Sequence, residues 1–93
     1  MGRVLPRILV VDDDAVLRGV LVPVIERLGC AVTSAASADP ARGVCVGRPF
    51  FALAVVDLNL GDGDGIEFIE ELHRVHQGTA LTLRGPGAAV RDL

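Results

Sequence analysis

The stretch "ALAVVDLNLGDGDG" (residues 52–65) decides how this chain folds. An apolar run leads directly into Asp57, and a loop with two further aspartates among three glycines follows. The stretch "RILVVDDDA" (residues 7–15) has the same form, with aliphatic residues followed by carboxylates. A continuous aliphatic run is typical of a strand that is buried on both faces, as in parallel sheets. The sequence therefore predicts two such strands, each with acidic residues at its carboxyl end.

Helical patterns separate the strand patterns along the chain. Asp14 is a typical N-cap for the first helix, and the dipeptide Asp39-Pro40 is a typical start for the second. The predicted strands cover residues 4–11, 31–35, 50–56 and 80–83, and the predicted helices cover 15–28, about 39–47 and 66–77, with a last helical turn from residue 86. Strands that alternate with helices predict an α/β fold with a parallel sheet and right-handed crossovers.

The carboxylates at the strand ends are the candidate functional residues. In an open α/β sheet, ligands bind beyond the carboxyl ends of the strands, so neighbouring strands would bring Asp12, Asp13 and Asp57 together. Carboxylates placed so close repel one another unless a cation lies between them. Oxygen ligands favour Mg²⁺ over Zn²⁺. A metal there neutralises phosphoryl oxygens and leaves one aspartate as a nucleophile, which predicts a metal-assisted phosphoryl acceptor.

Simpler interpretations stay open for these polar residues. Asp14 is expected only to cap its helix, and the other three aspartates could likewise be caps or solvated groups. The glycine-rich loop at residues 61–65 is expected to be a plain tight turn. A calcium-binding loop that starts at Asp57 is rejected, because it lacks the glycine and the glutamate of that motif. His73 and His76 are expected on a solvated helix face.

Composition excludes several classes of function. The 93 residues carry a net charge of −3, so the basic excess of a nucleic-acid-binding surface is missing. No apolar run has transmembrane length and no signal peptide is evident, so we expect a cytoplasmic protein that does not bind membranes. Cys30 and Cys45 have no metal-binding or redox spacing and are expected to be buried, inert thiols.

The stretches "ILVVDDDAVLR", "ERLGCAVTSAASADPARG" and "FALAVVDLNLGDGDGIEFIEEL" together resemble the receiver domain of response regulators in two-component signalling. The resemblance covers residues 7–76. It implies a flavodoxin-like, CheY-like fold, whose parallel sheet has the strand order 2-1-3-4 as far as this chain extends.

The resemblance also implies a role for individual residues. Asp57 would accept a phosphoryl group from a sensor histidine kinase or a phosphotransfer protein, so the chain would be a phosphoprotein in a relay and not an enzyme. Asp13 would bind Mg²⁺ directly, Asp12 would act through water, and the backbone carbonyl of Asn59 would complete the site. Thr82 is the candidate for the hydroxyl residue that senses the phosphoryl group at the end of the fourth strand.

The chain departs from the family pattern after residue 76. A complete receiver has a fifth strand, which ends in a lysine, and a fifth helix; this chain contains no lysine, and its tail at residues 78–93 is atypical. We therefore expect residues 1–93 to form one truncated receiver domain without an output domain. The apolar surface left uncovered predicts a homodimer or higher oligomer. Two alternatives are a degenerate receiver that acts as an interaction module without phosphorylation, and a truncated gene product without a selected function.

Overall fold

The structure is a computed structural model that describes residues 5–45, 51–57, 59–60, 63–75 and 80–84. Strands and helices alternate along most of the chain, as the sequence pattern predicts. The elements are β1 (Arg7–Val11), α1 (Ala15–Arg27), β2 (Ala31–Ala35), α2 (Ala38–Cys45), β3 (Leu53–Asp57), β4 (Asn59–Leu60), β5 (Gly63–Asp64), α3 (Gly65–Val75) and β6 (Ala80–Arg84).

The main sheet is parallel and has the order β2-β1-β3-β6. β1 lies between β2 and β3, and Ile8 is level with Val32 on one side and with Leu53 on the other. Because β6 is the fourth predicted strand, the α/β fold class and the 2-1-3-4 order are confirmed. The sequence did not predict the small antiparallel pair of β4 and β5, since two-residue strands are too short to show a hydropathy period.

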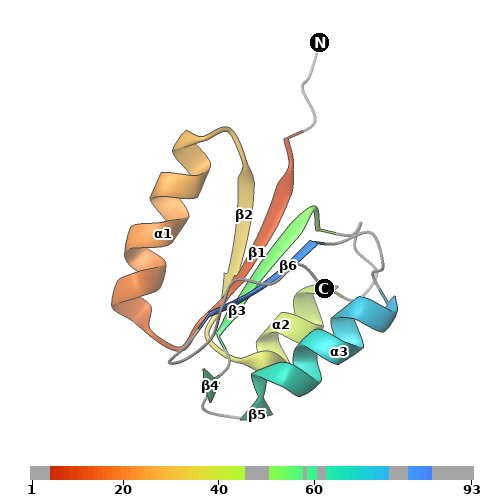
Figure 1. Cartoon of the computed structure of the whole chain (residues 1–93). Coiled ribbons are helices and arrows are strands. Elements are labelled where there is room, and N and C mark those ends of the chain that lie inside the picture. The colour runs from red at the N-terminus through yellow and green to blue at the C-terminus, as the bar shows by residue number, and fades with distance from the viewer. Residues whose placement is uncertain (1–4, 46–50, 58, 61–62, 76–79, 85–93) are drawn as a thin grey trace.

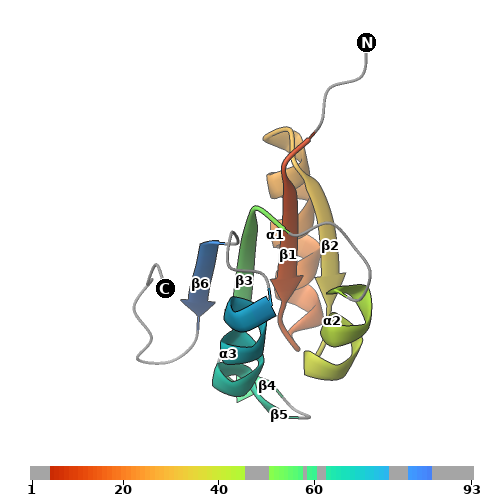
Figure 2. The same ribbon diagram turned by 90° about the vertical axis from the view of Figure 1, so that its right-hand side faces the viewer.

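The helices form two layers, one on each face of the sheet. Of the described helices, α1 lies on one face, whereas α2 and α3 lie side by side on the other (Figures 1 and 2). The core lies between the sheet and the α2/α3 layer. Its buried residues are Leu9, Val11, Ala35, Ala38, Ala41, Phe51, Ala54, Val56, Phe68, Ile69 and Leu72.

Helix α1 begins and ends as its sequence predicts. The Asp14 carboxylate accepts hydrogen bonds from the backbone N–H groups of Val16 (3.0 Å) and Leu17 (3.1 Å), so the expected N-cap is confirmed. Gly29 follows the helix with a φ of 92°, a conformation that glycine adopts without a steric penalty. No residue of α1 is fully buried, although apolar residues recur along it at helical spacing.

Helix α2 begins at Ala38, one residue before the predicted cap Asp39. Pro40 is thus the third helical residue, where a backbone N–H would have no partner inside the helix anyway. Arg42 ties α2 to α3, because its guanidinium donates two hydrogen bonds of 2.9 Å to the Glu71 carboxylate. The hydrogen bonds from Arg42 lower the pKa of Glu71 below its usual value of 4.5.

Several other predictions can be compared with the described part of the chain. No helix found in those ranges is both long and apolar enough to cross a membrane. His73 is exposed on α3, as expected. Cys30 and Cys45 are half-buried, where full burial was expected, and burial raises the pKa of the Cys45 thiol. His76, residues 61–62 of the predicted turn and the predicted helical turn after residue 85 lie outside the described residues.

Candidate metal centre

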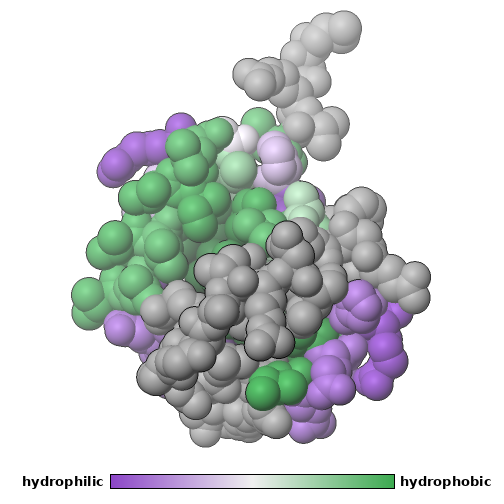
Figure 3. Space-filling view, viewed as in Figure 1, coloured by the Kyte–Doolittle hydropathy of each residue, from purple (hydrophilic) through white to green (hydrophobic). Residues whose placement is uncertain are grey.

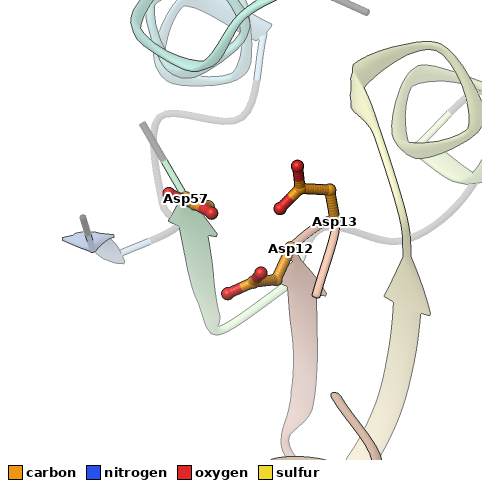
Figure 4. A group of neighbouring side chains, drawn as sticks. All are labelled: Asp12, Asp13 and Asp57. Carbon is orange, nitrogen blue, oxygen red and sulfur yellow. The ribbon is translucent and has the colours of Figure 1, made fainter. Parts of the chain in front are cut away.

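The ends of β1 and β3 bring the three predicted carboxylates together. Val11 is level with Val56 in the parallel pair, so the residues that follow, Asp12 and Asp57, leave the sheet side by side. Asp13 is the next residue of the β1–α1 loop. Figure 4 shows the three side chains gathered around the space beyond the strand ends.

The three side chains lie close enough to share one cation. One carboxylate oxygen from each of Asp12, Asp13 and Asp57 lies within 4.8 Å of the other two. Asp12 is 2% exposed and Asp57 is 8% exposed, whereas Asp13 is open to solvent. The cluster therefore has two buried acids at its base and one exposed acid at its entrance. Such an arrangement concentrates negative charge at one point of the surface.

Hydrogen bonds hold the β1–α1 loop in the shape that forms this cluster. The Asp12 backbone N–H donates to the Ala35 carbonyl at the end of β2 (3.1 Å). One carboxylate oxygen of Asp12 accepts a hydrogen bond from the Asp14 backbone N–H (2.9 Å). Asp14 in turn caps α1. The loop is thus fixed at both of its ends, to the sheet and to the helix.

Arg18 is part of this network and was not among the predicted site residues. Its Nη1 donates a 2.6 Å hydrogen bond to the backbone carbonyl of Asp12. The Arg18 backbone N–H is bonded to the Asp14 carbonyl, which places Arg18 one turn after the helix cap (3.0 Å). From there its guanidinium reaches back over the first turn of α1 to the loop. The sequence signal was an arginine four residues after the helix cap, which is too common a feature to indicate a site by itself.

The ligand chemistry of the cluster fits a hard divalent cation. Its donors are carboxylate oxygens, without the thiolates or imidazoles that Zn²⁺ prefers. A cation between them would offset the repulsion of three carboxylates within 4.8 Å of one another. Phosphoryl oxygens could enter from the side of the exposed Asp13 and reach the same cation.

The other two predicted site residues can be placed only by their backbone. Asn59 begins β4, two residues after the end of β3, and pairs with Asp64. Thr82 lies on β6 level with Val55, whereas Asp57 is level with Arg84. Thr82 therefore stands two residues, or about 6.6 Å along the strand, before the level of Asp57. Arg84, the last residue of β6, is the residue level with Asp57.

Comparison with known proteins identifies the family. The sequence model of the response regulator receiver domain matches residues 8–84. Among curated proteins, the photosynthetic apparatus regulatory protein RegA of Cereibacter sphaeroides is 37% identical over 82 residues, which cover 87% of this chain and 44% of RegA. This chain therefore spans less than half the length of that relative.

Solved structures give the same result. A CheY-like response regulator receiver domain protein from Methanospirillum hungatei has a TM-score of 0.86 and 31% identity, over 92% of this chain and 68% of that one. A response regulator from Burkholderia pseudomallei, solved with a phosphorylated aspartic acid and a calcium ion, has a TM-score of 0.78 and 32% identity, over 84% of this chain and 45% of that one. The family model matches most of the chain, and the fold and the acidic strand ends agree with it. This chain therefore belongs to the response regulator receiver domain family.

Proposed function

We propose that this chain is a phosphate-accepting receiver in two-component signalling, with Asp57 as the acceptor. The donor is the phosphohistidine of a sensor histidine kinase or of a phosphotransfer protein. Asp13, Asp57 and the backbone carbonyl of Asn59 would bind Mg²⁺ directly, and Asp12 would act through water. The observation that carries the proposal is the approach of three carboxylates, within 4.8 Å, from the ends of two adjacent parallel strands.

The residues of the site have separate roles in the transfer. An Asp57 carboxylate oxygen forms a bond to phosphorus while the bond from phosphorus to the imidazole nitrogen breaks. The electron pair of that bond stays on the imidazole, which takes up a proton from water. A bound Mg²⁺ supplies charge neutralisation for the phosphoryl oxygens. The burial of Asp57 restricts the approach of water, and the bonds at Asp12 and Asp14 hold the loop in position.

Phosphorylation of the intact chain tests the proposal directly. We expect incubation with acetyl phosphate and Mg²⁺ to add one phosphoryl group, measured by intact mass spectrometry, and chelation of Mg²⁺ to prevent the addition. Asp57→Ala should abolish it. Asp39→Ala is the matched control, because it removes an aspartate from the exposed surface of α2 and should leave the modification intact. A wild-type chain that stays unmodified with Mg²⁺ would contradict the proposal.

A second candidate function is association without phosphorylation. It is supported by two observations: Arg84 and not Thr82 is level with Asp57, and no lysine occurs among the 93 residues. In that case the chain would bind a kinase or another regulator and stay unmodified. The mass measurement, combined with a binding assay against a histidine kinase, separates the two functions.

We also propose that the chain associates with itself, because helix α1 exposes large apolar side chains on its outer side in the described part of the chain (Figure 3). A partner of the same kind would bury the apolar surface that α1 leaves in contact with water.

A further inference from the structure

The end of β6 lies beside the candidate metal centre. β6 pairs with β3 in parallel, and the two strands run side by side in Figure 2. Arg84 is the last residue of β6 and is level with Asp57, the last residue of β3. Neighbouring strands are about 4.8 Å apart, and an arginine side chain is longer than that spacing. An arginine at this register position can therefore reach a group that is bound at Asp57.

Most arginines of the described ranges lie at the other end of the sheet. Because crossover helices run opposite to the parallel strands, their last turns lie near the amino ends of the strands. Arg7 begins β1, and three further arginines are in last helical turns: Arg27, Arg42 and Arg74. Within those ranges, Arg18 and Arg84 are left at the carboxyl end, where the three carboxylates lie.

These two arginines belong to different sides of the site. Arg18 donates its hydrogen bond to the backbone carbonyl of Asp12, so it supports the β1–α1 loop. Arg84 is placed by its register one strand beyond Asp57, on the side away from β1, because β3 lies between β1 and β6. Two carboxylates and one arginine thus follow one another across the ends of these adjacent strands.

The charges of the site require a further cation during phosphoryl transfer. Three carboxylates lie within 4.8 Å of one another, and a bound divalent cation leaves them with a net negative charge. An entering phosphoryl group brings more negative charge, which is spread over its oxygens in the transition state. Arginine suits these oxygens, because its planar fork presents parallel N–H donors. The 93 residues contain no lysine, so arginine supplies the permanent positive charges of this sequence.

We propose that Arg84 is a catalytic residue for the phosphorylation of Asp57. Its guanidinium donates hydrogen bonds to the phosphoryl oxygens while the bond from Asp57 to phosphorus forms, and it stays protonated throughout. This inference rests on the proposed function and adds a residue to its mechanism. The register favours Arg84 over Thr82, which lies two residues before the level of Asp57 on the same strand.

The rate of phosphorylation by acetyl phosphate at saturating Mg²⁺, followed by intact mass spectrometry, tests this role. We expect Arg84→Gln to lower the rate by about tenfold or more, because it removes charged donors from the transition state. Arg84→Lys keeps the charge without the fork and should lose less. Thr82→Ala should also lose less than Arg84→Gln. Arg74→Gln is the matched control, because it removes an exposed arginine from the last turn of α3 and should leave the rate unchanged.

Calorimetric titration with Mg²⁺ alone separates this role from a merely structural one. We expect Arg84→Gln to bind Mg²⁺ more tightly than wild type, because the variant lacks a positive charge that repels the ion. A disturbed site would instead bind it more weakly, which would overturn the proposal.

Two kinetic outcomes would also overturn the proposal: equal rates for Arg84→Gln and wild type, or a faster Arg84→Gln, which would mean that Arg84 blocks Asp57. A wild-type chain that stays unmodified would instead contradict the proposed function itself, and this inference with it.

Discussion

The two faces of the sheet differ in how completely helices cover them. On the α2/α3 face, Phe68, Ile69 and Leu72 are almost inaccessible to water and belong to one large buried cluster. On the α1 face, one helix without a fully buried residue covers the sheet. The comparison teaches that the two faces contribute unequally to stability. The first face supplies the buried core, whereas the described helix on the second face leaves large apolar side chains exposed to water.

Truncation of the core on the α2/α3 face should have the largest effect on stability. We expect Leu72→Ala to lower the free energy of unfolding by about 2–5 kcal/mol, because it removes buried contacts and leaves a cavity. On the α1 face, Val20→Ala should change it by less than about 0.5 kcal/mol in the monomer. Urea denaturation followed by circular dichroism at low protein concentration measures both.

A milder core substitution is needed as well, because Leu72→Ala could prevent the chain from folding. Ile69→Val, in the same cluster, should cost about 0.5–1.5 kcal/mol and leave a folded protein. If Val20→Ala proved as costly as the core substitutions at protein concentrations where the chain is monomeric, α1 would be a full part of the core. The contrast between the two faces would then be wrong.

The second prediction concerns the strand ends between the two helical layers. Without metal, the carboxylates of Asp12, Asp13 and Asp57 repel one another at separations within 4.8 Å. We expect Asp57→Asn to raise the free energy of unfolding in chelator by about 1 kcal/mol, from Coulomb repulsion at this spacing. Thermal denaturation with and without Mg²⁺ measures the change.

Metal should stabilise the two proteins to different extents. Wild type should gain about 1.4 kcal/mol when free Mg²⁺ is about ten times its dissociation constant, because the ion binds the folded state. Asp57→Asn should gain much less. Equal stabilisation of both by Mg²⁺ would mean that the ion binds elsewhere on the chain.

The third prediction tests the contribution of α1 to the site. Arg18 holds the Asp12 carbonyl through a 2.6 Å bond, and this bond fixes the loop that presents the carboxylates. We expect Arg18→Gln to weaken Mg²⁺ binding by about tenfold, as for other residues that support metal ligands. Isothermal titration calorimetry measures the affinity.

Arg27→Gln, on the same helix but in its last turn, is the matched control, measured where the chain is monomeric. An Arg18→Gln chain that binds Mg²⁺ more tightly would show that the charge of Arg18 outweighs its positioning role.

Much of the fold could be predicted from hydropathy patterns and end signals. The aliphatic runs before Asp12 and Asp57 identified two central strands, and Asp14 marked the start of α1 correctly. The start of α2 was placed two residues late, because Asp39-Pro40 has the pattern of a cap followed by a first helical residue, whereas the helix begins at Ala38. The apolar spacing of α1 suggested a buried face, but apolar residues lie on much of its circumference and only one side can face the sheet.

The parts of the site that depend on strand order could be predicted from the sequence. The parts that depend on strand register, or on the direction of a long side chain, could not. Parallel neighbours place their carboxyl ends together, so the convergence of Asp12 and Asp57 followed from the fold. The level of Thr82 did not follow, because an aliphatic run does not specify the register in which its strand pairs with a neighbour. Arg18 was missed because its role depends on a long side chain that folds back toward the loop.

The smallest expected effect on stability concerns the hydrogen-bonded pair of Arg42 and Glu71, which joins α2 to α3. Glu71 accepts two hydrogen bonds from Arg42, whose guanidinium also lies 5.9 Å from the centre of the Phe68 ring. We expect Glu71→Gln to lower stability slightly at neutral pH, since the pair is partly exposed and screened by salt. Urea denaturation across a pH series, with a double-mutant cycle that includes Arg42→Gln, measures the effect.

The pH dependence of this effect has a definite sign. The pKa of Glu71 is lower in the folded chain than its usual value of 4.5, so its stabilisation is fully present above pH 4.5. The stabilisation should be lost as the pH falls through the lowered pKa, and the wild-type and Glu71→Gln curves should then converge. Glu70→Gln removes a charge from an exposed position of the same helix and is the matched control. A difference between wild type and Glu71→Gln that persists in acid would show that the charge of Glu71 is not the source of its contribution to stability.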